Sequence, residues 1–183
     1  MKQIEYKIRN ISKAVLSPRL ETFGASKLFE GEIVTTYYES KALNFTASGK
    51  RLSMRTKGDF TMLTYKNKYH DLEVSVSDEL EVEVTNPLAM NGILEGLGFE
   101  QMMKFHKNRT DYRIDNATFS FDKYIGEYSF IPEFLTIESD NEAIIFYWAE
   151  ELGIDREKLE GITILDMIKE YQSKNDEPVF DPN

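Results

Sequence analysis

Charged side chains recur at every second position in several stretches of this sequence. In residues 4–8, the charged side chains of Glu5 and Lys7 alternate with apolar ones, and a similar alternation occurs in residues 79–84 and 107–112. Successive side chains of a β-strand point to opposite faces, so each stretch predicts a strand with one apolar face and one ionic face.

An ionic face repeated on many strands has two interpretations, a solvated sheet surface or the polar lining of a barrel. If the ionic faces converge inside a barrel, the buried charges must pair or meet a ligand. A polyphosphate meets that demand, because Arg and Lys donate to its oxygens while a hard divalent cation joins carboxylates to phosphate. The candidate cations are Lys7, Arg55, Lys66, Lys107 and Arg109, and the candidate carboxylates are Glu5, Glu79, Glu81, Asp122 and Glu138.

The composition narrows the class of protein. A chain of 183 residues with 41% hydrophobic residues fits one globular domain. The absence of cysteine excludes disulfides, thiolate metal sites and cysteine nucleophiles. A formal net charge of −10 argues against general binding to nucleic acid. The first residues read as a strand and not as a signal peptide, and the longest apolar run, residues 143–149, is too short for a membrane helix. We therefore expect a cytoplasmic protein.

Periodicity and turn residues predict an α+β fold. We expect one domain over residues 1–172 and a mobile tail over 173–183, with an eight-stranded antiparallel β-barrel, closed or nearly closed, and helices packed outside it. Ser17 and Pro18 read as the start of the first helix, and Gly24 reads as its end. The predicted strands are 2–9, 31–40, 51–56, 60–66, 72–84, 100–113, 117–123 and 133–138, and the predicted helices are 17–23, 87–97, 140–152 and 156–172.

Common catalytic motifs do not occur in the sequence. There is no phosphate-binding G-x-x-x-x-G-K-[ST] loop and no G-x-S-x-G nucleophile elbow. His70 and His106 have no partner at metal-binding or triad spacing, so we interpret both as ordinary surface or hydrogen-bonded histidines. The alternating charges are therefore the strongest signal of function.

Seven short motifs in this order resemble the CYTH family, the triphosphate tunnel metalloenzymes that include class IV adenylate cyclases and thiamine triphosphatases. Each motif is weak alone, but their common order is fairly specific. The similar segments are QIEYK (3–7), RLSMR (51–55), LTYK (63–66), ELEVEV (79–84) with the later LGF (97–99), KNRTDY (107–112), Asp122, and FLTIE (134–138).

The resemblance implies a tunnel that cyclises or hydrolyses a triphosphate with Mg²⁺ or Mn²⁺. It implies ATP, thiamine triphosphate or tripolyphosphate as ligand, and it allows a homodimer. By the same resemblance, the metal would be held by Glu5, Glu79, Glu81 and Glu138 with help from Asp122, phosphate oxygens would be bound by Arg55, Lys66, Lys107 and Arg109, and Lys7 would act as the catalytic cation.

Three residues depart from the family motifs. Gln3 stands where the family has its first glutamate, Ser53 replaces an arginine, and Thr136 replaces a glutamate. These changes leave three classes of function open: a metal-dependent enzyme, a non-catalytic nucleotide or polyphosphate sensor, and a plain β-sheet interaction protein. The motifs do not separate cyclisation from hydrolysis. A cyclase must also hold a base, which could stack on Tyr37, Tyr38, Tyr65 or Phe105 if these aromatics do not belong to the core.

Overall fold

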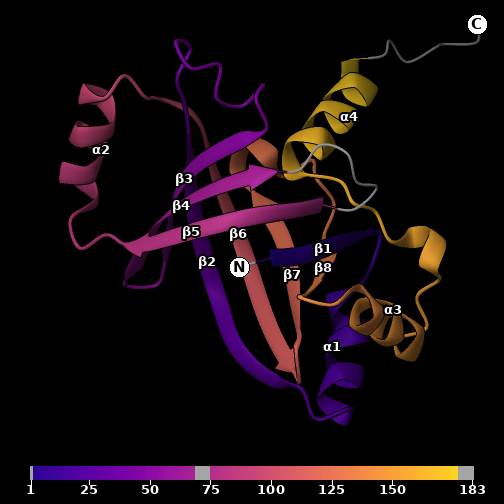
Figure 1. Ribbon diagram of the computed structural model, residues 1–183. Helices are drawn as coiled ribbons and strands as arrows, with labels where there is room; N and C mark the ends of the chain where they lie inside the picture. Colours follow the sequence, from indigo (N-terminus) through magenta and orange to yellow (C-terminus); the bar gives the residue numbers. More distant parts are fainter. Residues whose placement is uncertain (1, 69–74, 177–183) are drawn as a thin grey trace, which may run out of the picture.

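An antiparallel β-sheet curls on itself and forms the body of the molecule (Figure 1). The computed structural model describes residues 2–68 and 75–176, and it confirms the predicted α+β barrel. Within these ranges the strands are β1 (Lys2–Arg9), β2 (Ser26–Glu39), β3 (Lys50–Lys57), β4 (Phe60–Lys68), β5 (Ser75–Glu83), β6 (Glu100–Ile114), β7 (Ala117–Ile125) and β8 (Phe134–Ser139).

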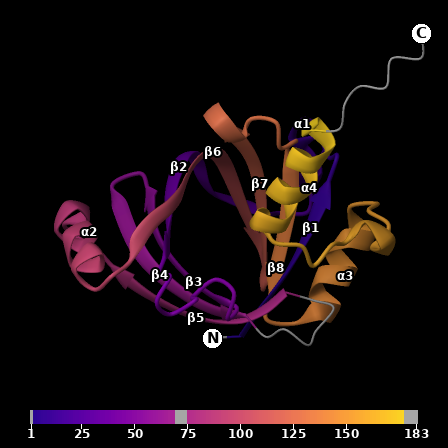
Figure 2. The ribbon, with the colours of Figure 1, turned by 90° about the horizontal axis from the view of Figure 1, so that it is seen from above.

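Strand pairing follows the order β1-β5-β4-β3-β2-β6-β7-β8 and closes on β1. In the described residues, β1 shares six register pairs with β8 and four with β5. The long strands β2 and β6 pair along most of their length and join the two walls of the curled sheet, which Figure 2 shows from above. Alternation along each strand then sends one set of side chains into the space between the walls.

The helices pack against apolar side chains of the sheet, three of them on its outer face. In the described residues they are α1 (Lys13–Thr22), α2 (Pro87–Gly96), α3 (Glu142–Glu151) and α4 (Ile164–Asp176), with short 3₁₀ turns η1 (Gly126–Tyr128) and η2 (Arg156–Lys158). Leu20 of α1 and Trp148 of α3 pack on Phe119 and Ile137, which lie on the outer face of β7 and β8. Burying these large side chains supplies most of the stability of this wall.

A second apolar cluster lies beside the cavity, on the inner side of the sheet. Met167 and Ile168 of α4 pack against Phe105, Tyr124 and Phe134, which come from β6, β7 and β8. A third cluster lies on the opposite wall, where Leu94 of α2 packs over outer side chains of β2 and β3. Figure 1 shows α2 on the side of the molecule opposite to α1, α3 and α4.

The first helix begins earlier than predicted. It starts at Lys13, so Pro18 lies inside it and not at its first position. A proline in a helix interior removes one backbone hydrogen bond. The burial of Leu16 and Leu20 offsets that cost, because both side chains enter the core shared with α3. The predicted end is confirmed, since Gly24 takes a left-handed φ of +89°.

The predicted strand 72–84 and the predicted helix 156–172 also differ from the structure. Strand β5 covers Ser75–Glu83, and the rest of the predicted strand, like His70, lies outside the described residues. The last helix is interrupted, because Glu160 pairs with the backbone of Lys7 and Thr163 starts α4 by a hydrogen bond with Asp166. Helix α4 continues to Asp176, beyond the predicted start of the tail.

Some outward apolar side chains of β5 are not covered by a helix. Leu80 and Val82 alternate with inward glutamates as predicted, but they are 69% and 55% exposed. The reason is that α2 reaches β2 and β3 and leaves the outer face of β5 open. Among the described residues, no helix is both long and apolar enough to cross a lipid bilayer.

Candidate functional site

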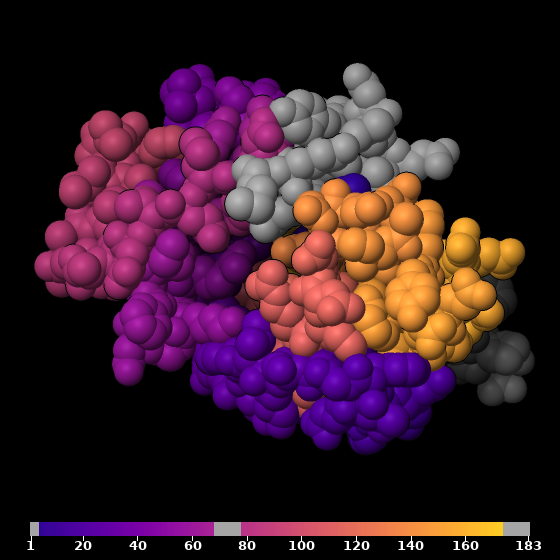
Figure 3. All heavy atoms as spheres, turned by 60° about the horizontal axis from the view of Figure 1, so that its bottom comes forward, coloured from indigo at the N-terminus to yellow at the C-terminus, as the bar shows by residue number. Residues whose placement is uncertain are grey.

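The inner face of the curled sheet encloses a cavity of about 260 Å³. In Figure 3 the surface is hollowed between the magenta wall on the left and the salmon and orange atoms beside it. All ten side chains predicted from the alternating pattern line this cavity, which confirms that the ionic faces of the strands point inward. The charged lining residues are Glu5, Lys7, Arg51, Arg55, Lys66, Glu79, Glu81, Lys107, Arg109, Asp111, Asp122 and Glu138.

Asp122 is the centre of the most buried ion cluster. Its carboxylate is about 1% exposed as a residue and accepts hydrogen bonds from Arg109 Nε at 2.7 Å, Arg109 Nη2 at 2.5 Å and Lys107 Nζ at 2.9 Å. The register explains this meeting, because Arg109 on β6 lies directly opposite Asp122 on β7. Burial alone would raise the pKa of Asp122, but the two cations outweigh it and hold the pKa well below its usual range.

Lys107 makes only one of the three hydrogen bonds to the Asp122 carboxylate. Arg109 engages both carboxylate oxygens in a bidentate pair, so Lys107 gains less from Asp122 than a lone partner would. Burial, reinforced by the nearby Arg109 guanidinium, lowers the pKa of Lys107 to about 7. The tunnel therefore contains a cation that is only weakly held in its charged form.

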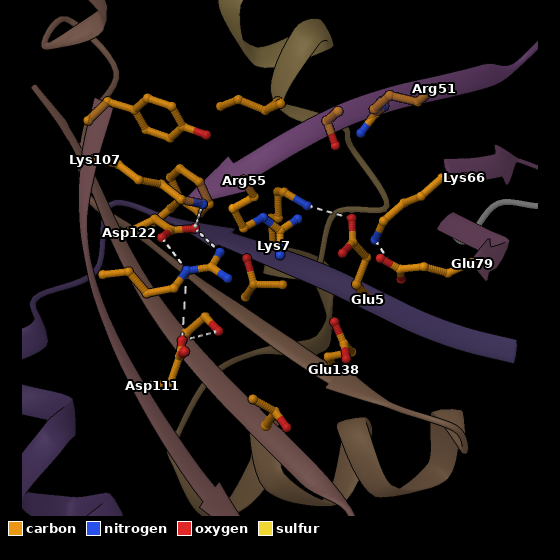
Figure 4. A pocket seen from close by; sticks show the side chains of 18 of the residues that line it. Glu5, Lys7, Arg51, Arg55, Lys66, Glu79, Lys107, Asp111, Asp122 and Glu138 are labelled. Carbon is orange, nitrogen blue, oxygen red and sulfur yellow. Dashed lines mark hydrogen bonds and ion pairs between the residues drawn. The ribbon is translucent and has the colours of Figure 1, made fainter. Parts of the chain in front are cut away.

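Two further ion pairs lie toward the β5 side of the cavity. Lys7 Nζ is 2.9 Å from Glu5 Oε1, and Lys66 Nζ is 2.9 Å from Glu79 Oε2 (Figure 4). Burial would raise the pKa of Glu5, but Lys7 and Lys66 lower it to about 2. Glu81 is held differently, because its carboxylate accepts a hydrogen bond from the Thr64 hydroxyl at 2.8 Å.

Among the described residues, three charged side chains of the cavity have neither an ionic partner nor a hydrogen bond. Within the ranges that the structure describes, Arg51, Arg55 and Glu138 form no ion pair or hydrogen bond. Burial and then the neighbouring carboxylates of Glu5 and Glu79 raise the pKa of Glu138. No fully buried side-chain nitrogen or oxygen in the described residues lacks a hydrogen-bond partner, so these three groups present their polar atoms to the cavity. Two anion-binding groups and one cation-binding group are thus free.

The alternation also contains cavity residues that the motif comparison did not select. Arg51 and Asp111 have the same parity as Arg55 and Arg109 on their strands, and that parity was the signal that could have found them. Asp111 is buried, accepts a hydrogen bond from Ser120 Oγ at 2.8 Å and pairs with Lys57 Nζ at 2.6 Å. Conversely, Arg9 continues the alternation of β1 but pairs with glutamates outside the cavity.

The aromatic side chains proposed to stack on a base lie in different parts of the structure. Only Tyr37 lines the cavity, whereas Phe105 belongs to the core beneath α4, and Tyr38 and Tyr65 belong to the cluster beneath α2. His106 points away from the cavity, where its Nδ1 lies 2.8 Å from a Glu32 carboxylate oxygen. Period-two geometry explains why Tyr38, Tyr65 and His106 point away from the cavity. Phe105 instead has the inward parity of Lys107, and it is kept out of the lining because α4 packs over it.

The carboxylates fit a hard divalent cation by their chemistry. Glu138 faces two other carboxylates and has no cation of its own, and oxygen donors of this kind suit Mg²⁺ and Mn²⁺. Within the described residues, however, no group of three or more metal-ligating side chains is already arranged around one point. The reason is that Glu5 and Glu79 are occupied by Lys7 and Lys66.

Two of the three departures from the family motifs line the cavity. Ser53 and Thr136 line it and are buried, so each replaces a longer charged side chain by a short hydroxyl. Gln3 belongs to β1 and pairs with Ser77, but its side chain lies outside the described part of the structure. At positions 53 and 136 the cavity is therefore lined by shorter, uncharged side chains, while the strands that carry them stay paired.

These features define a class of protein: an antiparallel β-tunnel whose interior is lined by matched cations and carboxylates. The model of the CYTH domain matches residues 1–161, and the chain belongs to that family. No curated protein sequence matches this chain.

Solved structures with a similar fold come from several organisms. PH1012 from Pyrococcus horikoshii OT3 is 25% identical, with a TM-score of 0.76 over 90% of this chain and 98% of that chain. An adenylate cyclase candidate from Vibrio parahaemolyticus is 14% identical, with a TM-score of 0.74 over 91% and 97%. HpAC1 from Hippeastrum, described as an adenylyl cyclase candidate with a dominant triphosphatase activity, is 17% identical, with a TM-score of 0.65 over 94% and 96%.

Proposed function

We propose that this protein binds the triphosphate group of a small molecule inside the tunnel and hydrolyses it with Mg²⁺ or Mn²⁺ as cofactor. The observation that carries the proposal is the incomplete pairing of the cavity. The described part of the chain leaves the guanidinium of Arg55 and the carboxylate of Glu138 without partners in one enclosed space. An anion bound together with a divalent cation would satisfy both groups.

The proposed roles follow from the position of each side chain. Arg55, Lys66, Lys107 and Arg109 would donate hydrogen bonds to phosphate oxygens and fix the anion along the tunnel. Lys7 is buried beside Glu5 and would neutralise negative charge that grows on the transferred phosphoryl group. Catalysis would depend mainly on positioning and charge neutralisation, as in other phosphoryl transfers.

The carboxylates would hold the cofactor. Glu138 together with Glu5, Glu79 and Glu81 offers the oxygen donors, whereas the oxygens of Asp122 are already engaged by Arg109 and Lys107. A bound Mg²⁺ or Mn²⁺ supplies positive charge to the phosphate oxygens and lowers the pKa of bound water. Competition between this cation and the two lysines for Glu5 and Glu79 would couple metal binding to phosphate binding.

The size and lining of the cavity favour hydrolysis of a triphosphate over cyclisation of a nucleotide. Its volume of about 260 Å³ is below the range of about 300–1,000 Å³ typical of pockets that enclose drug-sized ligands. Charged and hydroxyl side chains dominate the lining, and Tyr37 is one of only a few aromatic groups in it. The triphosphatase activity described for HpAC1 agrees with this choice.

A second candidate is a polyphosphate-binding protein without turnover. Within the described residues no metal-binding group is preformed, and two carboxylates of the family motifs are replaced at Gln3 and Thr136. Either feature would lower the affinity for Mg²⁺ or Mn²⁺ and leave phosphate binding intact.

Incubation with tripolyphosphate, ATP or thiamine triphosphate, each with Mg²⁺ or Mn²⁺, tests the proposal. Mass spectrometry of the products distinguishes orthophosphate release from formation of cyclic AMP and pyrophosphate. We expect metal-dependent release of orthophosphate. Binding without any product would support the second candidate, and neither binding nor turnover of all three compounds would refute the proposed function.

A further inference from the structure

Arg51 is a cation of the tunnel to which the family motifs give no role. It lies near the start of β3, and its side chain shares the inward face of that strand with Ser53 and Arg55. Figure 4 shows it on the same side of the cavity as Lys66 and Glu79. Arg51 is therefore part of the lining and not of the outer surface.

The surroundings of Arg51 leave its guanidinium available. It has no carboxylate partner in the described part of the chain. Its guanidinium carbon lies 5.7 Å from the centroid of the Tyr37 ring. Its direct cross-strand neighbour is Lys66, another inward cation, which already pairs with Glu79. Arg51 also contributes to the low pKa of Glu5, which places its charge close to the carboxylates.

Ser53 explains why a cation at position 51 matters. The motif has an arginine at position 53, but Ser53 is short and buried, so no charge reaches the cavity from there. Two residues along a strand correspond to a shift of about 7 Å on the same face. The second arginine of β3 is thus present, but it is displaced toward the side of Lys66 and away from Arg55.

We propose that Arg51 binds the end of the triphosphate that lies on the Lys66 side of the tunnel, and that it selects three linked phosphates over two. The inference rests on the proposed function. Arg51 and Arg55 are four residues apart, which separates their backbone positions by about 13 Å along the strand. A chain of three phosphates can contact both guanidiniums more easily than a chain of two, so Arg51 adds affinity chiefly for the longer anion.

Calorimetric titration of tripolyphosphate and pyrophosphate into the purified protein and three variants tests this role. Arg51→Ala should weaken tripolyphosphate binding about tenfold or more, the loss typical of a charged hydrogen bond, and should weaken pyrophosphate binding much less. Lys50→Ala is the matched control, because Lys50 is the exposed neighbour on the same strand and the variant loses the same charge. Arg109→Ala is the control for the site itself. Unchanged melting temperatures of the Arg51 and Lys50 variants will show that both remain folded.

The outcomes separate the inference from the proposed function. If Arg109→Ala loses tripolyphosphate binding while Arg51→Ala binds both anions like the wild type, the role of Arg51 is wrong and the proposed function stands. An equal loss for both anions in Arg51→Ala would overturn the selectivity for three phosphates. If the wild-type protein does not bind tripolyphosphate, the proposed function fails and this inference fails with it.

Discussion

Asp122→Asn is the substitution that most directly probes the buried charges of the tunnel. The carboxylate accepts three hydrogen bonds from Arg109 and Lys107, and it is almost fully buried. An asparagine keeps the shape but removes the negative charge and turns an NH₂ group toward two cations. Breaking a buried ion pair from one side costs about 3–5 kcal/mol, because the remaining charge stays buried without a partner.

For a domain of this size, about 1 kcal/mol corresponds to about 2–4 °C in melting temperature, so we expect Asp122→Asn to melt about 6–20 °C lower. Tripolyphosphate at about 100 times its Kd should raise the free energy of unfolding of the variant by about 2.7 kcal/mol. The reason is that the anion can pair with Arg109 and Lys107 after their carboxylate partner is removed. Thermal and urea unfolding at pH 7, with and without tripolyphosphate, measure both effects. Asp115→Asn, in the exposed β6–β7 turn, is the control for loss of charge. Equal stability of the two variants would refute the reasoning.

Three further predictions concern single groups of the cavity. Lys66→Ala should weaken tripolyphosphate binding at least about tenfold in calorimetry, whereas the outward Lys123→Ala should not; equal affinities would remove Lys66 from the site. Glu138→Gln should abolish the stabilisation by Mn²⁺ in thermal unfolding, because it removes the free carboxylate, and equal Mn²⁺ shifts for variant and wild type would exclude Glu138 as a ligand. Lys107 has a pKa of about 7 in the folded protein and about 10.5 in the unfolded chain, so the unfolded chain binds more protons between these values. The free energy of unfolding of the wild type should therefore rise by up to about 1.4 kcal/mol relative to Lys107→Met between pH 8 and 9. Urea unfolding in which the two proteins show the same pH dependence would contradict the buried lysine.

The period-two alternation predicted which charged side chains share a face, and the resemblance to the CYTH motifs predicted that this face lines a tunnel. Every candidate from Glu5 to Glu138 lies on the cavity side of its strand, because residues with the same parity on one strand share a face. The predicted strand ranges 51–56, 60–66, 100–113 and 117–123 agree within a few residues with the two hairpins β3–β4 and β6–β7. Their chemical roles in binding and catalysis stay predictions.

The partners within the cavity could not be predicted, because strand order and register are properties of the whole sheet. Nothing near Arg109 in the sequence specifies Asp122 as its partner, and the pairing of β6 with β7 creates that contact. The helices were less predictable for a similar reason. Pro18 lies inside α1 because tertiary burial outweighs local propensity, and the chain before α4 is extended because it pairs with β1.

A crystal structure of the protein with tripolyphosphate and Mn²⁺ is the most direct test of the central claim. The account predicts phosphate oxygens within hydrogen-bonding distance of Arg55 and Arg109, and the metal ion beside Glu138. An anion bound only on the outer surface, with the cavity holding neither phosphate nor metal at millimolar concentrations, would contradict it.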